Sequence, residues 1–212
     1  RVSLPEEAHG LCCSQIWEHK GNPAGQRLTA NRTIESFYKW SGGGRIPIFC
    51  DTTSCTHTLL FETGGDILTP ENREKYKQLK IMDITQWLKE VVLPRIKVIR
   101  PKNRILLHPT CSCQIMGLTP VLLDIARKCA REVILPDNWG CCGASGDRGF
   151  IFPELSDSAT RDERDEIGHE SFDGCYSLAR TCEIAMQDHM SRSFIWWMRQ
   201  FRTRERRYEV LV

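Results

Sequence analysis

A cysteine doublet occurs twice in this chain, each time in the same local sequence. Residues 2–14 contain VSLP followed by GLCCS, and residues 133–143 contain VILP followed by GCCG. A single cysteine follows each doublet at a similar distance, Cys55 after 42 residues and Cys182 after 40 residues. Because an internal repeat indicates duplicated structure, a repeat marked by thiols predicts a metal or iron–sulfur site in each half.

The composition limits the class of protein. A chain of 212 residues can form one large domain or two small ones, and the repeat favours two pseudo-equivalent halves. With 41% hydrophobic residues the chain can build a core. A net charge of only +2 argues against a nucleic-acid-binding function. No apolar run reaches the roughly 20 residues that a membrane-spanning helix needs.

The cysteine content favours ligands over disulfides. The eleven cysteines are an odd number, so disulfides alone would leave one thiol over. Adjacent cysteines rarely bond to each other, because the backbone between them is too short for relaxed disulfide geometry. We therefore expect a reducing compartment and thiolate ligands.

The order of apolar and polar segments predicts an α/β fold. Short strands are expected over residues 2–4, 45–50, 104–108 and 132–135, and helices over 23–40, 83–93, 119–131, 157–169 and 174–190. This alternation predicts short parallel sheets flanked by helices. Every cysteine motif except the last follows an expected strand, so we expect the cysteine loops at the carboxyl ends of the strands.

Four segments are expected along the chain. Residues 1–65 form the first cysteine-rich half, 66–103 a helical connector, 104–190 the second half and 191–212 a basic tail. Cys111 lies 30 residues before Cys141, whereas the equivalent place in the first half falls before Arg1. We therefore expect a fragment of a longer protein. The tail, with six arginines and two glutamates, is expected to be disordered, and peripheral membrane contact is the alternative.

The spacing of the thiols matches neither standard zinc nor standard ferredoxin patterns. Zinc sites usually contain tight C-x2-4-C knuckles, and the only close fit is Cys50-x4-Cys55. The C-x2-C-x2-C spacing of ferredoxins is absent. Thiolates select iron–sulfur clusters, zinc or Cu(I), and these alternatives stay open on spacing alone. The two thiol sets are Cys12, Cys13, Cys50 and Cys55, and Cys111, Cys113, Cys141, Cys142, Cys175 and Cys182.

The pattern Cys-x(~30)-Cys-Cys-Gly-x(~35–40)-Cys resembles the cysteine-rich, or CCG, domain. That domain occurs in heterodisulfide reductase and in the iron–sulfur subunits of glycolate and lactate oxidation. The segments GLCCSQIWEHKG, CDTTSCT, LHPTCS, NWGCCGASGDRGFIFPELSDSATRDE and RTCEIAM, which extend over about residues 1–187, resemble the C-terminal part of bacterial FAD- and iron–sulfur-dependent D-lactate dehydrogenases.

The resemblance implies a [4Fe-4S] cluster held by cysteines of each motif. In the second motif Ala179 occupies the position of the fifth cysteine, and in the first motif Thr52 replaces a cysteine and Ser14 replaces the glycine of the doublet. Cys50, Cys113 and His108 are further candidate ligands, whereas His19, His57 and Cys129 are expected to be structural. The residues that match the motifs are Cys12, Cys13 and Cys55 in the first half, and Cys111, Cys141, Cys142 and Cys182 in the second.

The resemblance also implies an activity for the whole enzyme. The chain would be an electron-transfer module of an oxidoreductase that oxidises D-lactate and would not turn over alone. Its partners would be FAD-binding and ferredoxin-like parts of the same enzyme and a quinone or cytochrome acceptor, and FAD would bind only the missing N-terminal part. We expect a cytoplasmic location, at the inner face of the cell membrane if the tail binds it. The alternatives are a zinc-stapled or metal-free docking scaffold, and thiol–disulfide chemistry like that of heterodisulfide reductase.

Overall fold

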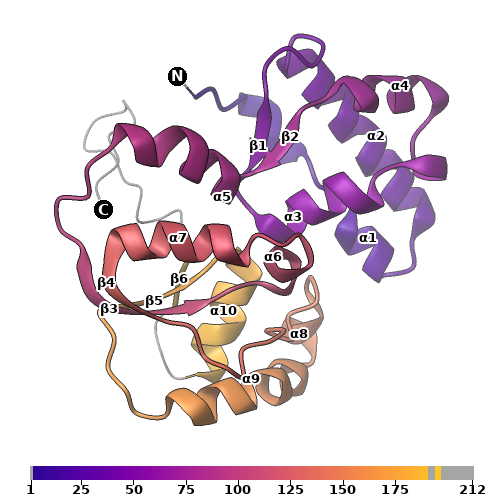
Figure 1. The fold of residues 1–212 in the computed structure, drawn as a ribbon. Helices are drawn as coiled ribbons and strands as arrows, with labels where there is room; N and C mark the ends of the chain where they lie inside the picture. The colour runs from indigo at the N-terminus through magenta and orange to yellow at the C-terminus, as the bar shows by residue number, and fades with distance from the viewer. Residues whose placement is uncertain (1, 191–193, 197–212) are drawn as a thin grey trace. The chain divides into compact units, whose positions relative to one another are not determined.

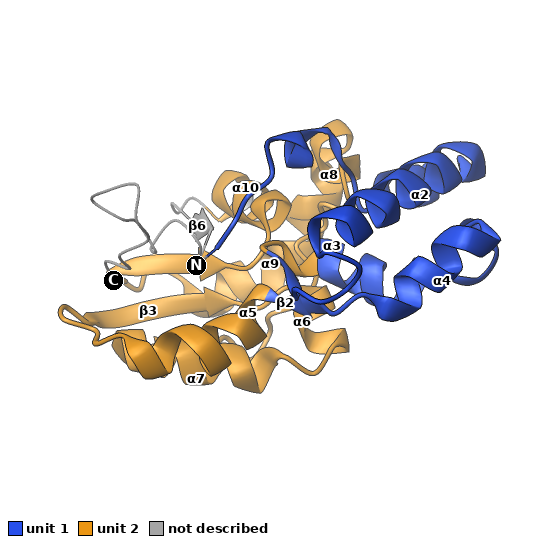
Figure 2. Ribbon diagram, turned by 90° about the horizontal axis from the view of Figure 1, so that it is seen from above, with its two compact units in different colours: residues 1–50, 55–83 blue, residues 51–54, 84–212 orange. Residues whose placement is uncertain are grey.

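The chain has a mixed α/β fold with short parallel sheets flanked by helices, as the sequence predicts (Figure 1). The computed structural model describes residues 2–190 and 194–196. It divides the chain into two compact units, residues 1–50 with 55–83 and residues 51–54 with 84–212 (Figure 2). Apart from residues 194–196, the basic tail expected over 191–212 lies outside the described residues.

Unit 1 contains a two-stranded parallel sheet and several helices. Its strands β1 (Ile48–Cys50) and β2 (Ile81–Asp83) pair with Ile48 opposite Ile81. The helices and turns are η1 (Glu6–Gly10), α1 (Gln15–His19), α2 (Pro23–Trp40), α3 (Thr53–His57), the π-helical turn η2 (Thr58–Glu62), η3 (Gly65–Ile67) and α4 (Pro70–Gln78).

Helix α2 begins and ends where its sequence predicts. The Asn22 side chain accepts a hydrogen bond from the backbone N–H of Gly25 at 2.9 Å, and Pro23 occupies the first helical position. The helix ends before three consecutive glycines, residues 42–44, all with positive φ. Its buried side packs Ala30 and Ile34 against Leu68, which forms the small core of this unit.

Unit 2 contains a four-stranded parallel sheet in the order β4-β3-β5-β6. The strands are β3 (Lys102–His108), β4 (Ala130–Ile134), β5 (Gly174–Ser177) and β6 (Phe194–Trp196). The helices and turns are α5 (Ile84–Trp87), η4 (Leu88–Val92), η5 (Leu93–Arg95), α6 (Cys111–Ile115), α7 (Thr119–Cys129), α8 (Arg148–Ile151), α9 (Pro153–Ile167) and α10 (Arg180–His189).

Helices cover both faces of this sheet. Helix α7 lies on one face and α10 on the other, with α9 packed beside α10 (Figure 1). The central strand β3 is buried from Ile105 to His108, as expected for a parallel strand covered on both sides. Because all four strands run in the same direction, the loops after β3, β4 and β5 leave the sheet at the same edge.

Two expected elements differ in the structure. Residues 2–4, expected as a strand, are not part of a strand, and unit 1 pairs only β1 with β2 among its described residues. Residues 174–177, expected to begin a helix, form strand β5, and the helix that follows starts at Arg180. The apolar spacing of 174–190 suits a helix, but pairing with β3 places the first four residues in the sheet.

Candidate metal centre

The two cysteine doublets have the same backbone geometry. The residue after each doublet is left-handed, with φ 80° at Ser14 and φ 74° at Gly143. In both loops the backbone N–H of this residue donates to the sulfur of the first cysteine, at 3.4 Å from Ser14 to Cys12 and at 3.4 Å from Gly143 to Cys141. The sequence repeat is therefore also a structural repeat at the level of the doublet.

A second contact is repeated as well. The thiol of Cys142 donates to the sulfur of Cys182, with the two sulfurs 2.9 Å apart. In the first half the thiol of Cys13 hydrogen-bonds Cys55. In each half, therefore, the second cysteine of the doublet contacts the cysteine about 40 residues later in the sequence.

Ser14 is expected to be strained in this conformation, since a left-handed backbone costs a residue with a Cβ roughly 1–2 kcal/mol. We expect Ser14→Gly to raise the free energy of unfolding by roughly 0.5–1 kcal/mol, because glycine removes this strain but loses more backbone entropy. Urea denaturation followed by circular dichroism measures the change. Ser36→Gly, in the middle of α2, should have the opposite sign, and a loss of stability in both variants would contradict the argument.

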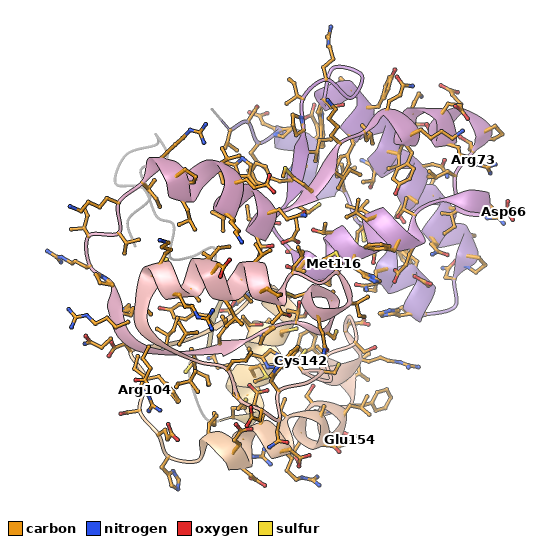
Figure 3. All side chains as sticks on the ribbon, viewed as in Figure 1. Asp66, Arg73, Arg104, Met116, Cys142 and Glu154 are labelled. Atoms are coloured by element: carbon orange, nitrogen blue, oxygen red, sulfur yellow. The ribbon has the colours of Figure 1, made fainter. Side chains whose placement is uncertain are left out.

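Three strands deliver the four second-half cysteines to one place. Cys111 is the first residue of α6 after β3, the doublet follows β4, and Cys182 lies in the first turn of α10 after β5. Cys111 hydrogen-bonds Cys141, Cys141 hydrogen-bonds Cys142, and Cys142 hydrogen-bonds Cys182. Cys142, labelled in Figure 3, and Cys182 are buried, whereas Cys111 and Cys141 are exposed. The group therefore reaches from the core to the surface.

The hydrogen bonds divide this group into two thiols and two favoured thiolates. Donation from Cys111 and Cys142 lowers the pKa of Cys141, and donation from Cys142 lowers the pKa of Cys182 despite its burial. The donors change in the opposite direction, since hydrogen bonding to Cys141 raises the pKa of Cys111 and of Cys142. The site therefore favours negative charge on two of its sulfurs, which suits a cationic ligand.

A buried histidine–glutamate pair lies beside these cysteines. His108 and Glu163 are 0% and 1% exposed, and His108 Nδ1 lies 2.8 Å from Glu163 Oε2. Burial alone would lower the pKa of His108. The hydrogen bond and charge of Glu163, with smaller contributions from Cys182 and Cys141, outweigh burial, so the net direction of the pKa is upward. The net effect of these groups is to favour the protonated form of His108.

The loops that carry the cysteines are held by side chains from other segments. Thr110 caps α6 by accepting a hydrogen bond from the backbone N–H of Cys113 at 3.2 Å. Glu166 accepts hydrogen bonds from the backbone N–H groups of Asp137 and Asn138 at 2.7 and 2.8 Å, and these bonds lower its pKa. Glu163 and Glu166, which lie on α9 and respectively support the histidine and the doublet loop, are not among the residues that the sequence predicts for the site.

The first-half cysteines make a smaller group. Cys12, Cys13 and Cys55 are half-buried and linked by hydrogen bonds through Cys13. The bond from Cys12 lowers the pKa of Cys13, but the bond to Cys55 and burial together raise it to about 12. Cys50, a further candidate, is the last residue of β1 and half-buried. This half therefore brings together three of the proposed ligands by hydrogen bonds.

Several other residues have clear structural positions. Cys113 is buried with its sulfur 3.9 Å from Thr119 Oγ1, Cys175 lies in the core with Cys142 and Cys182, and burial raises the pKa of Cys129 to about 11. His57 Nδ1 pairs with Glu62 Oε1 at 3.1 Å, and His19 is the exposed last residue of α1. Ala179, at the position where the resemblance implies a fifth cysteine, is fully buried and offers no donor side chain.

The donor set suits an iron–sulfur site or zinc. None of the eleven cysteines forms a disulfide, and thiolate sulfur is the preferred ligand of both. Among the described residues no group of three or more His, Cys, Asp or Glu side chains is arranged to hold a metal ion as it stands. The sulfurs instead make S–H···S contacts, which metal binding would replace as the thiols lose their protons.

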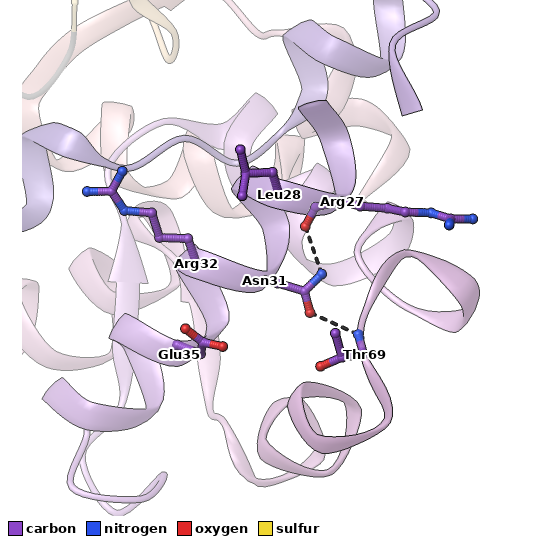
Figure 4. A pocket seen from close by; sticks show the side chains of 6 residues that line it. All are labelled: Arg27, Leu28, Asn31, Arg32, Glu35 and Thr69. Atoms are coloured by element: carbon purple, nitrogen blue, oxygen red, sulfur yellow. Dashed lines mark hydrogen bonds between the residues drawn. The ribbon is translucent and has the colours of Figure 1, made fainter. Parts of the chain in front are cut away.

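A separate surface depression lies on α2 in unit 1 and has a volume of about 480 Å³ (Figure 4). Asn31 at its base donates to the carbonyl of Arg27 at 2.7 Å and accepts from the backbone N–H of Thr69 at 2.9 Å. These bonds tie α2 to the start of α4, so the polar atoms at the base support the fold. The other lining residues are Leu28, Arg32 and Glu35.

Comparison of the chain with models of protein families and with curated proteins finds no match. In the part of the chain that the structure describes, no helix has the length and apolar character needed to cross a membrane.

Proposed function

We propose that the chain is the iron–sulfur electron-transfer module of a flavin-linked 2-hydroxy-acid dehydrogenase, with D-lactate as the substrate of the whole enzyme. The observation that carries the proposal is the convergence of Cys111, Cys141, Cys142 and Cys182 at the ends of three parallel strands. The resemblance of the two motifs to CCG domains supports iron–sulfur over zinc.

The residues of the chain would have distinct roles at this site. Cys111, Cys141, Cys142 and Cys182 would be the ligands, and Cys12, Cys13 and Cys55 would hold a second site with Cys50 beside them. When bound, an iron–sulfur cluster supplies one-electron transfer, and its potential depends on hydrogen bonds and solvent exposure. Because Cys111 and Cys141 are exposed, the second-half site has a side open to an electron donor or acceptor.

The proposal extends to the enzyme to which the chain would belong. The FAD-binding part would oxidise the hydroxy acid and pass electrons through ferredoxin-like clusters to this module, and a quinone or cytochrome would accept them. This chain would supply thiolate ligands and no acid–base chemistry on the substrate. We place the enzyme in the cytoplasm, at the inner face of the cell membrane where a quinone or cytochrome is accessible.

Anaerobic purification followed by iron and sulfide analysis and electron paramagnetic resonance (EPR) tests the proposal. We expect iron and acid-labile sulfide in near-equal amounts and a cluster signal in the reduced or oxidised protein. Cys141→Ser and Cys182→Ser should each remove most of the iron of the second-half site, because each removes a thiolate that the site needs.

Cys129→Ala is the matched control, because Cys129 is buried in the same unit but lies at the end of α7. It should keep the iron content and EPR signal of the unmodified chain. Zinc in place of iron, or a folded protein that binds no metal after reconstitution with ferrous iron and sulfide, would contradict the proposal and favour a docking scaffold.

A further inference from the structure

One nitrogen of the buried His108 ring has no hydrogen-bond partner. Its Nδ1 lies 2.8 Å from Glu163 Oε2, whereas Nε2 is inaccessible to solvent and unpaired. An imidazole nitrogen left in this state costs free energy, because it has lost water and gained no partner. The unpaired Nε2 is therefore available to a group that this part of the chain binds.

The ring is held in one orientation by the elements around it. His108 ends strand β3 and lies opposite Ser177 in the register with β5. Glu163 belongs to the buried side of α9, which also contains Ser156, Thr160 and Ile167 at helical spacing. The pair thus joins the central strand to a helix, and the ring cannot rotate without breaking its bond with Glu163.

The His108 ring belongs to the same part of unit 2 as the cysteine site, because it ends strand β3 three residues before Cys111. The positive charge of His108 contributes to the lowered pKa of Cys182 and of Cys141, the two cysteines whose thiolate form is favoured. Three groups of negative character, the buried Glu163 and Cys182 and the exposed Cys141, therefore act on one imidazole. These groups favour a protonated ring, and a proton on Nε2 would make the unpaired nitrogen a hydrogen-bond donor.

We propose that His108 is a positioning residue of the second-half site, and that its Nε2–H donates a hydrogen bond to a sulfur of the iron–sulfur cluster bound there. Glu163 holds the ring in place through Nδ1. This inference rests on the proposed function for the identity of the cluster. Supporting groups of this kind, a carboxylate behind a histidine that contacts a metal site, orient the site and tune the metal.

The reduction potential of the reconstituted protein tests this role. Hydrogen bonds to the sulfurs favour the reduced, more negative cluster and raise its potential. His108→Asn keeps a group that reaches Glu163 but removes the donor at Nε2. At the midpoint potential of the unmodified chain, we expect the ratio of reduced to oxidised cluster to fall about tenfold in His108→Asn, which for a one-electron couple corresponds to about 59 mV.

Two variants show whether the donor itself matters. His108→Gln, whose amide nitrogen can replace Nε2–H, should recover most of the potential. His169→Asn changes an exposed histidine of the same unit and should leave the potential unchanged. The iron content should stay near that of the unmodified chain in all three variants, because a donor to a cluster sulfur is not a ligand to iron.

Three other results would overturn the inference. An unchanged potential in His108→Asn would show that Nε2 does not contact the cluster. Loss of the iron and EPR signal in both His108 variants would identify His108 as a ligand or as a residue needed for folding. A chain that binds no iron even without substitution would overturn the proposed function as well, and the iron analysis distinguishes that result from a failure of the histidine role alone.

Discussion

Glu163→Leu is expected to lower the free energy of unfolding of the metal-free protein by about 3–5 kcal/mol. The substitution leaves His108 buried without its partner, and removing one member of a buried ion pair typically costs this amount. Glu163→Gln keeps an acceptor for Nδ1 and should cost less, roughly 1–3 kcal/mol. Urea denaturation of the reduced, metal-free chain measures both values.

A surface pair offers the matched control. Glu170 accepts a hydrogen bond from Arg104 at 2.5 Å, but its side chain is 49% exposed. Exposed ion pairs contribute roughly 0–1 kcal/mol, so Glu170→Leu should change stability by no more than that. Equal losses in Glu163→Leu and Glu170→Leu would show that burial of the His108–Glu163 pair has no special effect.

The same pair predicts a pH dependence. The folded pKa of His108 is raised above the ordinary value of 6.5, chiefly by Glu163 acting against burial and with help from Cys182 and Cys141. Its stabilising contribution is therefore fully present below the unfolded pKa and is lost as the pH rises through the folded pKa. Above about pH 6.5, the ordinary pKa of histidine, this part of the stability should fall with rising pH, and the fall should be absent in Glu163→Leu.

The grouping of the second-half cysteines could be predicted from the sequence, because cysteine is a rare residue and these cysteines have a recognisable spacing. The doublets mark the two loops, and the alternation of strands and helices predicts that loops after parallel strands share one edge. Cys111, Cys141 and Cys142 follow strands in this way. Cys182 is also among the predicted residues, and the structure shows that it too follows a strand, because β5 precedes α10.

The supporting residues could not be found in the same way. Glu163 and Glu166 belong to a helix rich in charged residues, where a glutamate that faces the core has the same local sequence as one that faces water. The sequence does contain one indication that Glu163 is buried, namely its helical spacing. Glu163 lies on the same side of the helix as Ile167 and the small residues Ser156 and Thr160. Strand β5 is only four residues long, and its place in the sheet depends on distant pairing with β3.

Gly143→Ala is expected to be among the most damaging single-methyl changes in unit 2, with a loss of about 2–5 kcal/mol in the free energy of unfolding. A Cβ at this position would lie 2.6 Å from Ser156 Cα and 2.7 Å from the Leu155 carbonyl oxygen. Both are backbone atoms of α9 and cannot move independently of the helix. The clash adds roughly 1–3 kcal/mol of overpacking to the roughly 1–2 kcal/mol cost of a left-handed alanine.

Gly117→Ala separates these two contributions. Gly117 is also left-handed, with φ 68°, but an added Cβ there would meet no atom within 4 Å. Gly117→Ala should therefore lower the free energy of unfolding only by the cost of a left-handed alanine, roughly 1–2 kcal/mol. The difference between the two variants then gives the cost of the clash between the doublet loop and α9. Equal losses would mean that α9 yields to the methyl group. A larger loss at Gly143 than at Gly117 would show that the residue after the second doublet must be glycine, because its Cα lies so close to the backbone of α9 that no Cβ fits between them.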